Sequence, residues 1–210
     1  MKNNILLVLL MACTNTLFGQ VKYDKNKEYN NLDEALRNPE KIFKLNLSNQ
    51  TVPLTMVDWS KFINLEYLSL KNDHLKEIPL GITRLKTLRT IDLSGNNFNN
   101  LPSDFDKLTE LEEVFLNDES NMNVPKTLET LAKLPNLKTL HLENDNLQLL
   151  PSELLQFRTL ENLYLGNNDL KRMPALQSLD HLKYLDLKGN QISPEFRDMQ
   201  NMNFGLKINF

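Results

Sequence analysis

The sequence predicts an α/β solenoid, in which short parallel strands stack into one sheet and irregular or helical segments connect them. The first observation is a pattern, L-x-x-L-x-L, that recurs in register between residues 42 and 187. The second is an apolar-proline pair that follows most of its copies. The third is the period of both features, about 23 residues, which is typical of repeat proteins and foreign to a single helix or strand.

Seven segments carry the pattern, some with other apolar residues in place of leucine. They begin at residues 42, 65, 88, 111, 137, 160 and 182, and their sequences are IFKLNL, LEYLSL, LRTIDL, LEEVFL, LKTLHL, LENLYL and LKYLDL. In L-x-L, both leucines point to one face of a strand and the middle residue points to the other. Strands stacked in parallel therefore bury one continuous core, which no single repeat could bury alone.

The segments between the strands return the chain to the start of the next repeat. Proline suits them because no ladder hydrogen bond is needed there, and the apolar-proline pairs are Ile78-Pro79, Leu101-Pro102, Val124-Pro125, Leu150-Pro151 and Met173-Pro174. The fourth return segment, PKTLETLAKLPNL, is longer than the others and predicts a helical turn or two. Asn121 stands where an apolar residue is expected, so we expect this repeat either to bulge or to expose its loop.

These motifs resemble the leucine-rich repeat family over residues 42–192, and the proline pairs are similar to its 23-residue class with bacterial and Ras-associated members. The resemblance implies a leucine-rich repeat solenoid shaped as a short arc, with the parallel β-sheet on its concave side and irregular or helical segments on its convex side. It also implies that one polar side chain per repeat, usually Asn, forms a ladder of turn hydrogen bonds. The corresponding residues here are Gln50, Asp73, Asn96, Glu119, Asp145, Asn168 and Asn190. An ionised carboxylate accepts but cannot donate. We therefore expect a looser ladder at Asp73 and Asp145, and Glu119 departs furthest from the family pattern.

An N-terminal helical cap is predicted at residues 21–41, because the end of a solenoid must be covered. Asn31 precedes Leu32 and is followed three residues later by Glu34. This spacing is typical of a capping box at the start of a helix.

A C-terminal cap is predicted at residues 193–210, after seven repeats at 42–192. Ser193 and Pro194 suit the first positions of a helix, and the alternation in residues 206–210 predicts a last strand. We expect no second domain and a monomer.

Residues 1–20 have the layout of a secretory signal peptide that is removed from the mature chain. Lys2 supplies positive charge, an apolar run follows from Ile5 to Ala12, and Gly19 lies near a suitable cleavage point. The run is too short to span a bilayer as a helix, so we expect no integral membrane span in the mature chain. With the Asn-rich and Lys-rich composition, this layout favours a bacterial protein that is secreted, periplasmic or on the cell surface.

Cys13, the one cysteine of the chain, leaves the location open. Cleavage after residue 20 would remove it. The stretch LMAC at residues 10–13 also resembles the lipobox of bacterial lipoproteins, in which the chain is cut before the cysteine and a lipid is attached. A lipid anchor at Cys13 would change where the protein resides rather than its fold.

Composition and motifs argue against catalysis and against nucleic acid. The net charge is −3, and no basic stripe of the kind that nucleic acids require is present. Phosphate-loop, zinc-protease and nucleophile-elbow motifs are missing from the sequence. The three histidines fall at different repeat positions: His74, His141 and His181. We therefore expect neither an enzyme nor a metal or other cofactor.

The candidate site is the concave face of the sheet, where positions 3, 5, 7 and 8 of each repeat point away from the core. Aromatic rings occupy position 5 in three successive repeats, and further rings and carboxylates surround them. Strands lie about 4.8 Å apart, so these rings should form one patch. The predicted partner-binding residues are Tyr67, Asp92, Glu113, Phe115, His141, Glu143, Tyr164 and Tyr184.

Two interpretations of this patch remain open from the sequence. Stacked rings on neighbouring strands stabilise a sheet, and exposed aromatic residues ringed by charge are typical of interface hot spots. The primary hypothesis is an exported, non-catalytic module that binds a protein partner with basic or amide groups. The alternatives are a surface carbohydrate binder, which would use the rings as platforms, and a purely structural envelope protein. The fold cannot choose among them.

Overall fold

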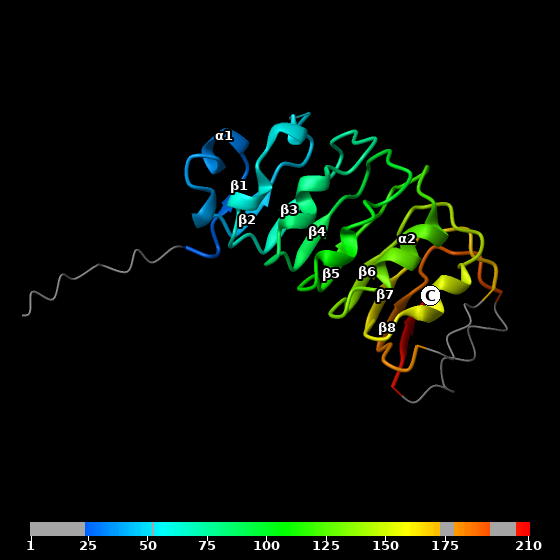
Figure 1. Ribbon diagram of the computed structural model, residues 1–210. Coiled ribbons are helices and arrows are strands. Elements are labelled where there is room, and N and C mark those ends of the chain that lie inside the picture. The colour runs from blue at the N-terminus through cyan, green and yellow to red at the C-terminus, as the bar shows by residue number, and fades with distance from the viewer. Residues whose placement is uncertain (1–23, 52, 173–178, 194–204) are drawn as a thin grey trace, which may run out of the picture.

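The computed structural model describes residues 24–51, 53–172, 179–193 and 205–210. These residues form one parallel sheet of nine strands whose spatial order follows the order of the chain. Figure 1 shows the colours passing in sequence from one end of a curved array to the other, with helical segments along one side of the strands. This arrangement confirms the predicted α/β solenoid.

Seven of the nine strands coincide with the seven sequence motifs. The strands are β1 Glu28–Tyr29, β2 Lys44–Asn46, β3 Tyr67–Ser69, β4 Thr90–Asp92, β5 Glu113–Phe115, β6 Thr139–His141, β7 Asn162–Tyr164, β8 Tyr184–Asp186 and β9 Lys207–Asn209. From β2 to β8, each residue pairs with the residue at the same repeat position in the next strand. The last strand was expected. The two-residue β1, which pairs with β2 through Tyr29 and Leu45, was not.

The return segments are short and mostly of the 3-10 type. They comprise α1 Leu32–Ala35, η1 Pro39–Lys41, η2 Leu54–Met56, η3 Trp59–Lys61, η4 Leu80–Arg84, η5 Phe105–Lys107, α2 Val124–Leu131 and η6 Ser152–Gln156. Helix α1 begins as its sequence predicts, because Asn31 Oδ1 accepts a hydrogen bond from the Glu34 N–H at 2.9 Å. The predicted signal segment with Cys13, the Met173-Pro174 pair and the helix expected from Pro194 all lie outside the described residues.

The core follows the predicted leucine positions. The middle residue of each strand from β2 to β8 is completely buried: Leu45, Leu68, Ile91, Val114, Leu140, Leu163 and Leu185. Each such side chain contributes roughly 1.5–3 kcal/mol relative to exposure. Trp59 is 1% exposed and donates from Nε1 to the Leu54 carbonyl at 3.3 Å. Its ring packs so closely over Gly81 that a β-carbon there would lie 2.7 Å from it.

The ladder of turn hydrogen bonds is complete where the polar residue is Asn. Asn168 Oδ1 accepts from the N–H groups of Asp145 at 2.9 Å and Leu147 at 3.0 Å. Its Nδ2 donates to the carbonyls of Leu142 at 2.7 Å and Leu165 at 3.0 Å. One buried amide therefore joins backbone groups of two adjacent repeats and fixes their relative register.

Where the ladder residue is an acid, fewer of these hydrogen bonds are kept, and they are bonds that the carboxyl group accepts. Glu119 and Asp145 accept backbone N–H groups at 2.8 and 2.7 Å, and Asp73 accepts one at 2.7 Å. The ladder therefore has fewer hydrogen bonds at Asp73 and Asp145, as expected for residues that accept but do not donate, although the bonds that remain are short. Among the described residues, the second oxygen of each of the three carboxyl groups is buried without a hydrogen-bond partner. These repeats lose the bonds that the Asn amide donates.

Burial strongly favours the neutral form of these three acids. It raises the pKa of Asp73 to about 6, that of Glu119 to about 8 and that of Asp145 to about 7. The hydrogen bonds that these acids accept from backbone N–H groups oppose this rise in pKa without cancelling it. A protonated carboxyl group carries an O–H donor, so in its neutral form each acid can donate as the Asn amide does.

The fourth repeat bulges just after its ladder residue. Glu119 keeps the ladder, and Asn121 is exposed, while the next residue, Met122, is 8% exposed and joins the core. Helix α2 follows, and Asn123 caps it by accepting from the Lys126 N–H at 3.2 Å. The predicted helical turns are confirmed, and the extra length is absorbed outside the strands.

Asn168→Ala should lower the free energy of unfolding by about 2–5 kcal/mol, because it leaves several buried backbone donors and acceptors unpaired. Urea unfolding followed by circular dichroism measures this. Gln148→Ala, at an exposed position of the neighbouring repeat, should change stability by no more than about 0.5 kcal/mol. Equal effects of the two substitutions would contradict the assigned ladder.

The free energy of unfolding should fall as the pH rises from about 4 to about 8. Asp73, Glu119 and Asp145 ionise near pH 4 when unfolded, but at about 6, 8 and 7 when folded. Between these limits the folded chain holds more protons than the unfolded chain, so stability is highest below the unfolded pKa values and is lost through the folded ones.

Asp145→Asn isolates one of these groups. It should stabilise the protein by about 1–3 kcal/mol at high pH, where the wild-type carboxylate is ionised and buried, and by much less near pH 5. Urea unfolding across this pH range is the measurement. Glu110→Gln, which neutralises an exposed acid, should leave the pH profile unchanged, and a profile equally unchanged in Asp145→Asn would refute the assignment.

Candidate partner-binding face

The concave face carries all eight predicted binding residues. They project from β3 to β8 or, for Glu143, follow β6 directly. All are half-buried except His141, which is 9% exposed. Phe115, His141 and Tyr164 are paired across β5, β6 and β7 because they share repeat position 5.

These three rings and Tyr184 form what we term the aromatic column. The Phe115 and His141 rings stack with centroids 3.9 Å apart and planes 13° apart, and His141 and Tyr164 stack at 4.3 Å and 6°. Tyr184 continues the column at 5.3 Å with a tilt of 51°. The first two spacings are shorter than the strand separation of about 4.8 Å, so the rings lean together. Their faces cover one another, and their edges point outward from the sheet.

His141 is more enclosed than its central place in the sequence pattern suggested. Its Nε2 lies 3.1 Å from Glu113 Oε1, and its Nδ1 lies 3.5 Å from Glu143 Oε2. Carboxylates only accept hydrogen bonds, so the ring donates from Nε2 to Glu113, and its Nδ1 faces the second carboxylate. His141 thus holds the column and two carboxylates in place, and leaves Phe115 and Tyr164 to present their edges.

Tyr67 and Asp92 lie beside the column rather than in it. Asp92 is in register with Phe115, one strand away. Its Oδ1 accepts the Ser94 N–H at 3.0 Å. Tyr67 stands farther along the sheet on β3, and burial raises its pKa, with the nearby charge of Asp92 adding to the shift.

Three further residues of the face were not among the predicted ones. Asn117 donates to Glu143 Oε2 at 3.3 Å and so orients that carboxylate. Asp186 accepts the Tyr184 hydroxyl at 3.3 Å. The Lys207 ammonium lies 5.7 Å from the centre of the Tyr184 ring and covers that end of the column. The alternation in residues 206–210 predicted the strand but gave no register, so Lys207 could not be placed.

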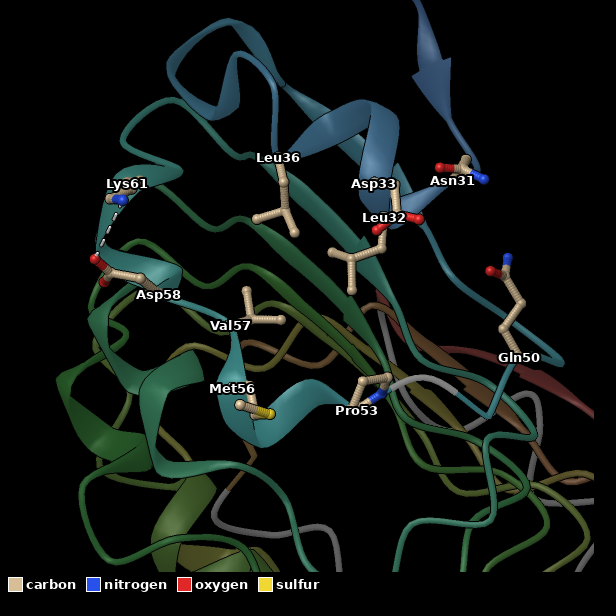
Figure 2. A pocket seen from close by; sticks show the side chains of 10 residues that line it. All are labelled: Asn31, Leu32, Asp33, Leu36, Gln50, Pro53, Met56, Val57, Asp58 and Lys61. Atoms are coloured by element: carbon tan, nitrogen blue, oxygen red, sulfur yellow. Dashed lines mark ion pairs between the residues drawn. The ribbon is translucent and has the colours of Figure 1, made fainter.

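A cavity of about 590 Å³ lies at the N-terminal end of the solenoid, away from the column. Figure 2 shows Leu32, Leu36 and Val57 pointing toward it from the cap and the first return segment. Asp58 and Lys61 form an ion pair of 3.9 Å at its edge. The lining is mainly apolar and holds no paired groups suited to acid–base or nucleophilic chemistry among the described residues.

Two further properties of the described residues bear on the site. No three His, Cys, Asp or Glu side chains in the part of the chain described here lie close enough together to hold a metal ion. Within the same ranges, no helix combines the length and apolar character needed to cross a membrane.

The repeats match two models of one protein family. The model described as a leucine-rich repeat region matches residues 40–138, and the one described as a leucine rich repeat matches residues 135–192. Together they cover the span in which the motifs recur. No curated protein matches the chain.

Solved structures of leucine-rich repeat solenoids share the fold. A leucine-rich repeat protein of Leptospira interrogans is 25% identical, with a TM-score of 0.57 over 87% of this chain. Toll of Drosophila, in complex with Spatzle, is 27% identical, with a TM-score of 0.61 over 82%. TLR13, in complex with a single-stranded RNA, is 22% identical, with a TM-score of 0.67 over 81%, which shows the fold alone.

This chain spans only part of each of those proteins: 57% of the Leptospira chain, 23% of Toll and 27% of TLR13. The recurring motif, the parallel sheet, the ladder and the family matches agree with one another. The chain belongs to the leucine-rich repeat family.

Proposed function

We propose that this chain is a non-catalytic protein-interaction module that binds a protein partner through the aromatic column and the acids around it. The observation that carries the proposal is the half-buried state of Phe115, Tyr164 and Tyr184 on the concave face. Aromatic rings with exposed edges beside charged groups have the composition of interface hot spots. The column is also rigid, so little side-chain freedom is lost on binding.

The column geometry favours a protein over a carbohydrate. A sugar platform needs an open ring face. Here both faces of His141 are covered by Phe115 and Tyr164 at 3.9 and 4.3 Å. What the column offers are ring edges, the Tyr hydroxyl groups, flanking carboxylates and the one face of Phe115 that is turned away from His141, which together suit polypeptide better than a sugar. Toll in its complex with Spatzle is a related fold bound to a protein.

Export is part of the same proposal. It is supported by the signal-like layout of residues 1–20 and by the resemblance of the stretch before Cys13 to a lipobox. A bacterial envelope or surface location would expose the concave face to partners outside the cytoplasm. An alternative role as a purely structural envelope component predicts no specific partner for that face.

Replacing Tyr164 with a photo-crosslinking phenylalanine analogue should give a specific adduct with a protein in intact cells, because the side chain lies in the middle of the proposed interface. Mass spectrometry of the adduct identifies the partner. The same probe at Met56, which is 87% exposed in η2 on the helical side, serves as the matched control.

Adducts that form at Met56 and not at Tyr164 would move the interface off the concave face. A glycan array probed with the wild-type chain and with a Phe115→Ser, His141→Asn, Tyr164→Asn variant tests the carbohydrate alternative, which requires binding that the variant loses. Thermal melting of the variant shows whether such a loss is due to unfolding.

A further inference from the structure

Two rows of charged side chains run along the sheet, and they differ in how their charges are balanced. The row at repeat position 2 alternates in sign from Arg89 to Lys183, and its acids are paired. Glu112 contacts Arg89 at 2.6 Å and Lys138 at 3.3 Å. Glu161 contacts Lys183 at 2.7 Å. Along this edge of the sheet the chain supplies its own counter-charges.

The acids of the concave face have no such counter-charges. Positions 3, 5 and 7 of the repeats that contain β4 to β7 hold three carboxylates and no lysine or arginine. In the described parts of the chain, no lysine or arginine forms an ion pair with Asp92, Glu113 or Glu143. His141 is the single group that can offset them, so the middle of the face is net negative whether its ring is neutral or charged.

The side of the Phe115 ring that is turned away from His141 adjoins these acids. Phe115 stacks on His141 through one face, while its other side is turned toward β4, where Asp92 is its register partner. Within the described residues, no other ring and no lysine or arginine contacts Phe115. The small Thr90 lies two residues before Asp92 on β4, in register with Tyr67 on one neighbouring strand and with Glu113 on the other. A flat cation can therefore reach the Phe115 face and a carboxylate together.

The ends of the concave face carry the opposite charge. At one end, Lys44 on β2 and Lys71 just after β3 outnumber Glu28 on β1; at the other, Lys188 and Lys207 outnumber Asp186. The face is thus negative in its middle and positive at both ends. This pattern attracts a peptide segment whose positively charged side chains lie in its middle. It repels polyphosphate from the aromatic column.

We propose that the partner presents an extended segment with arginine side chains, one of which stacks on the β4-facing side of Phe115 and pairs with Asp92 and Glu113. This inference rests on the protein-binding function proposed above. Arginine suits the site better than lysine, because its planar guanidinium stacks on a ring and forks carboxylate oxygens at the same time. An extended backbone places alternate side chains on one side, so successive arginines can face the sheet together.

Fluorescein-labelled dodecapeptides test this by polarisation, with serine alternating with arginine, lysine or glutamate and an all-serine peptide as reference. The arginine peptide should bind most tightly, the lysine peptide less tightly, and the all-serine and glutamate peptides least. The double variant Asp92→Asn, Glu113→Gln should weaken arginine binding about tenfold or more, while its amides still accept the contacts of Ser94 and His141. Raising the salt should weaken it further.

Glu112→Gln is the matched control, since it removes one negative charge from the paired row beside the face. It should change the affinity by less than about twofold. Equal binding of the arginine and all-serine peptides, or equal affinities of the double variant and the control, would overturn the inference. The crosslink at Tyr164 is read separately. If a protein adduct forms at Tyr164 but the chain shows no preference for the arginine peptide, this inference is contradicted and the proposed function stands.

Discussion

Hydrogen bonding by one buried polar side chain per repeat is the constraint on which the rest of the structure depends. Strands of three residues form too few backbone hydrogen bonds with their neighbours to define a register by themselves, and the apolar core is not directional. The Asn168 amide joins backbone groups of two repeats at once. This fixes each repeat one step along the arc from the last, so that equal motif positions pair across the sheet. The acids at three other steps preserve that register with fewer bonds, through a backbone N–H donated to each carboxyl group.

The aromatic column is a direct consequence of that register. Phe115, His141 and Tyr164 occupy the same position in successive repeats, and the register places them side by side. Stacking of such pairs contributes about 0.5–1.5 kcal/mol each beyond burial. The column therefore stabilises the sheet, and the same row of rings is the surface that the proposed function assigns to binding. The two interpretations of the patch that the sequence left open are compatible in the folded chain.

The sequence predicts what is set by period and alternation. Seven strands, their buried leucines, the Asn31 cap and the shared position of the three rings all follow from spacing. Ring orientation does not, because neighbours decide rotamers, and this is why the enclosure of His141 was not foreseen. Strand β1 was missed because two residues carry no periodic signal. Which hydrogen bonds are lost at the acidic ladder positions could not be predicted from the sequence, because this depends on the backbone geometry.

The most direct measurement of the binding face is hydroxyl-radical footprinting of the chain with and without the partner that crosslinks at Tyr164. Oxidation of Phe115, Tyr164 and Tyr184 should fall on binding, while the exposed Met56 and Leu80 of the helical side should be oxidised as before. Protection of Met56 and Leu80 with an unchanged column would contradict binding through the concave face.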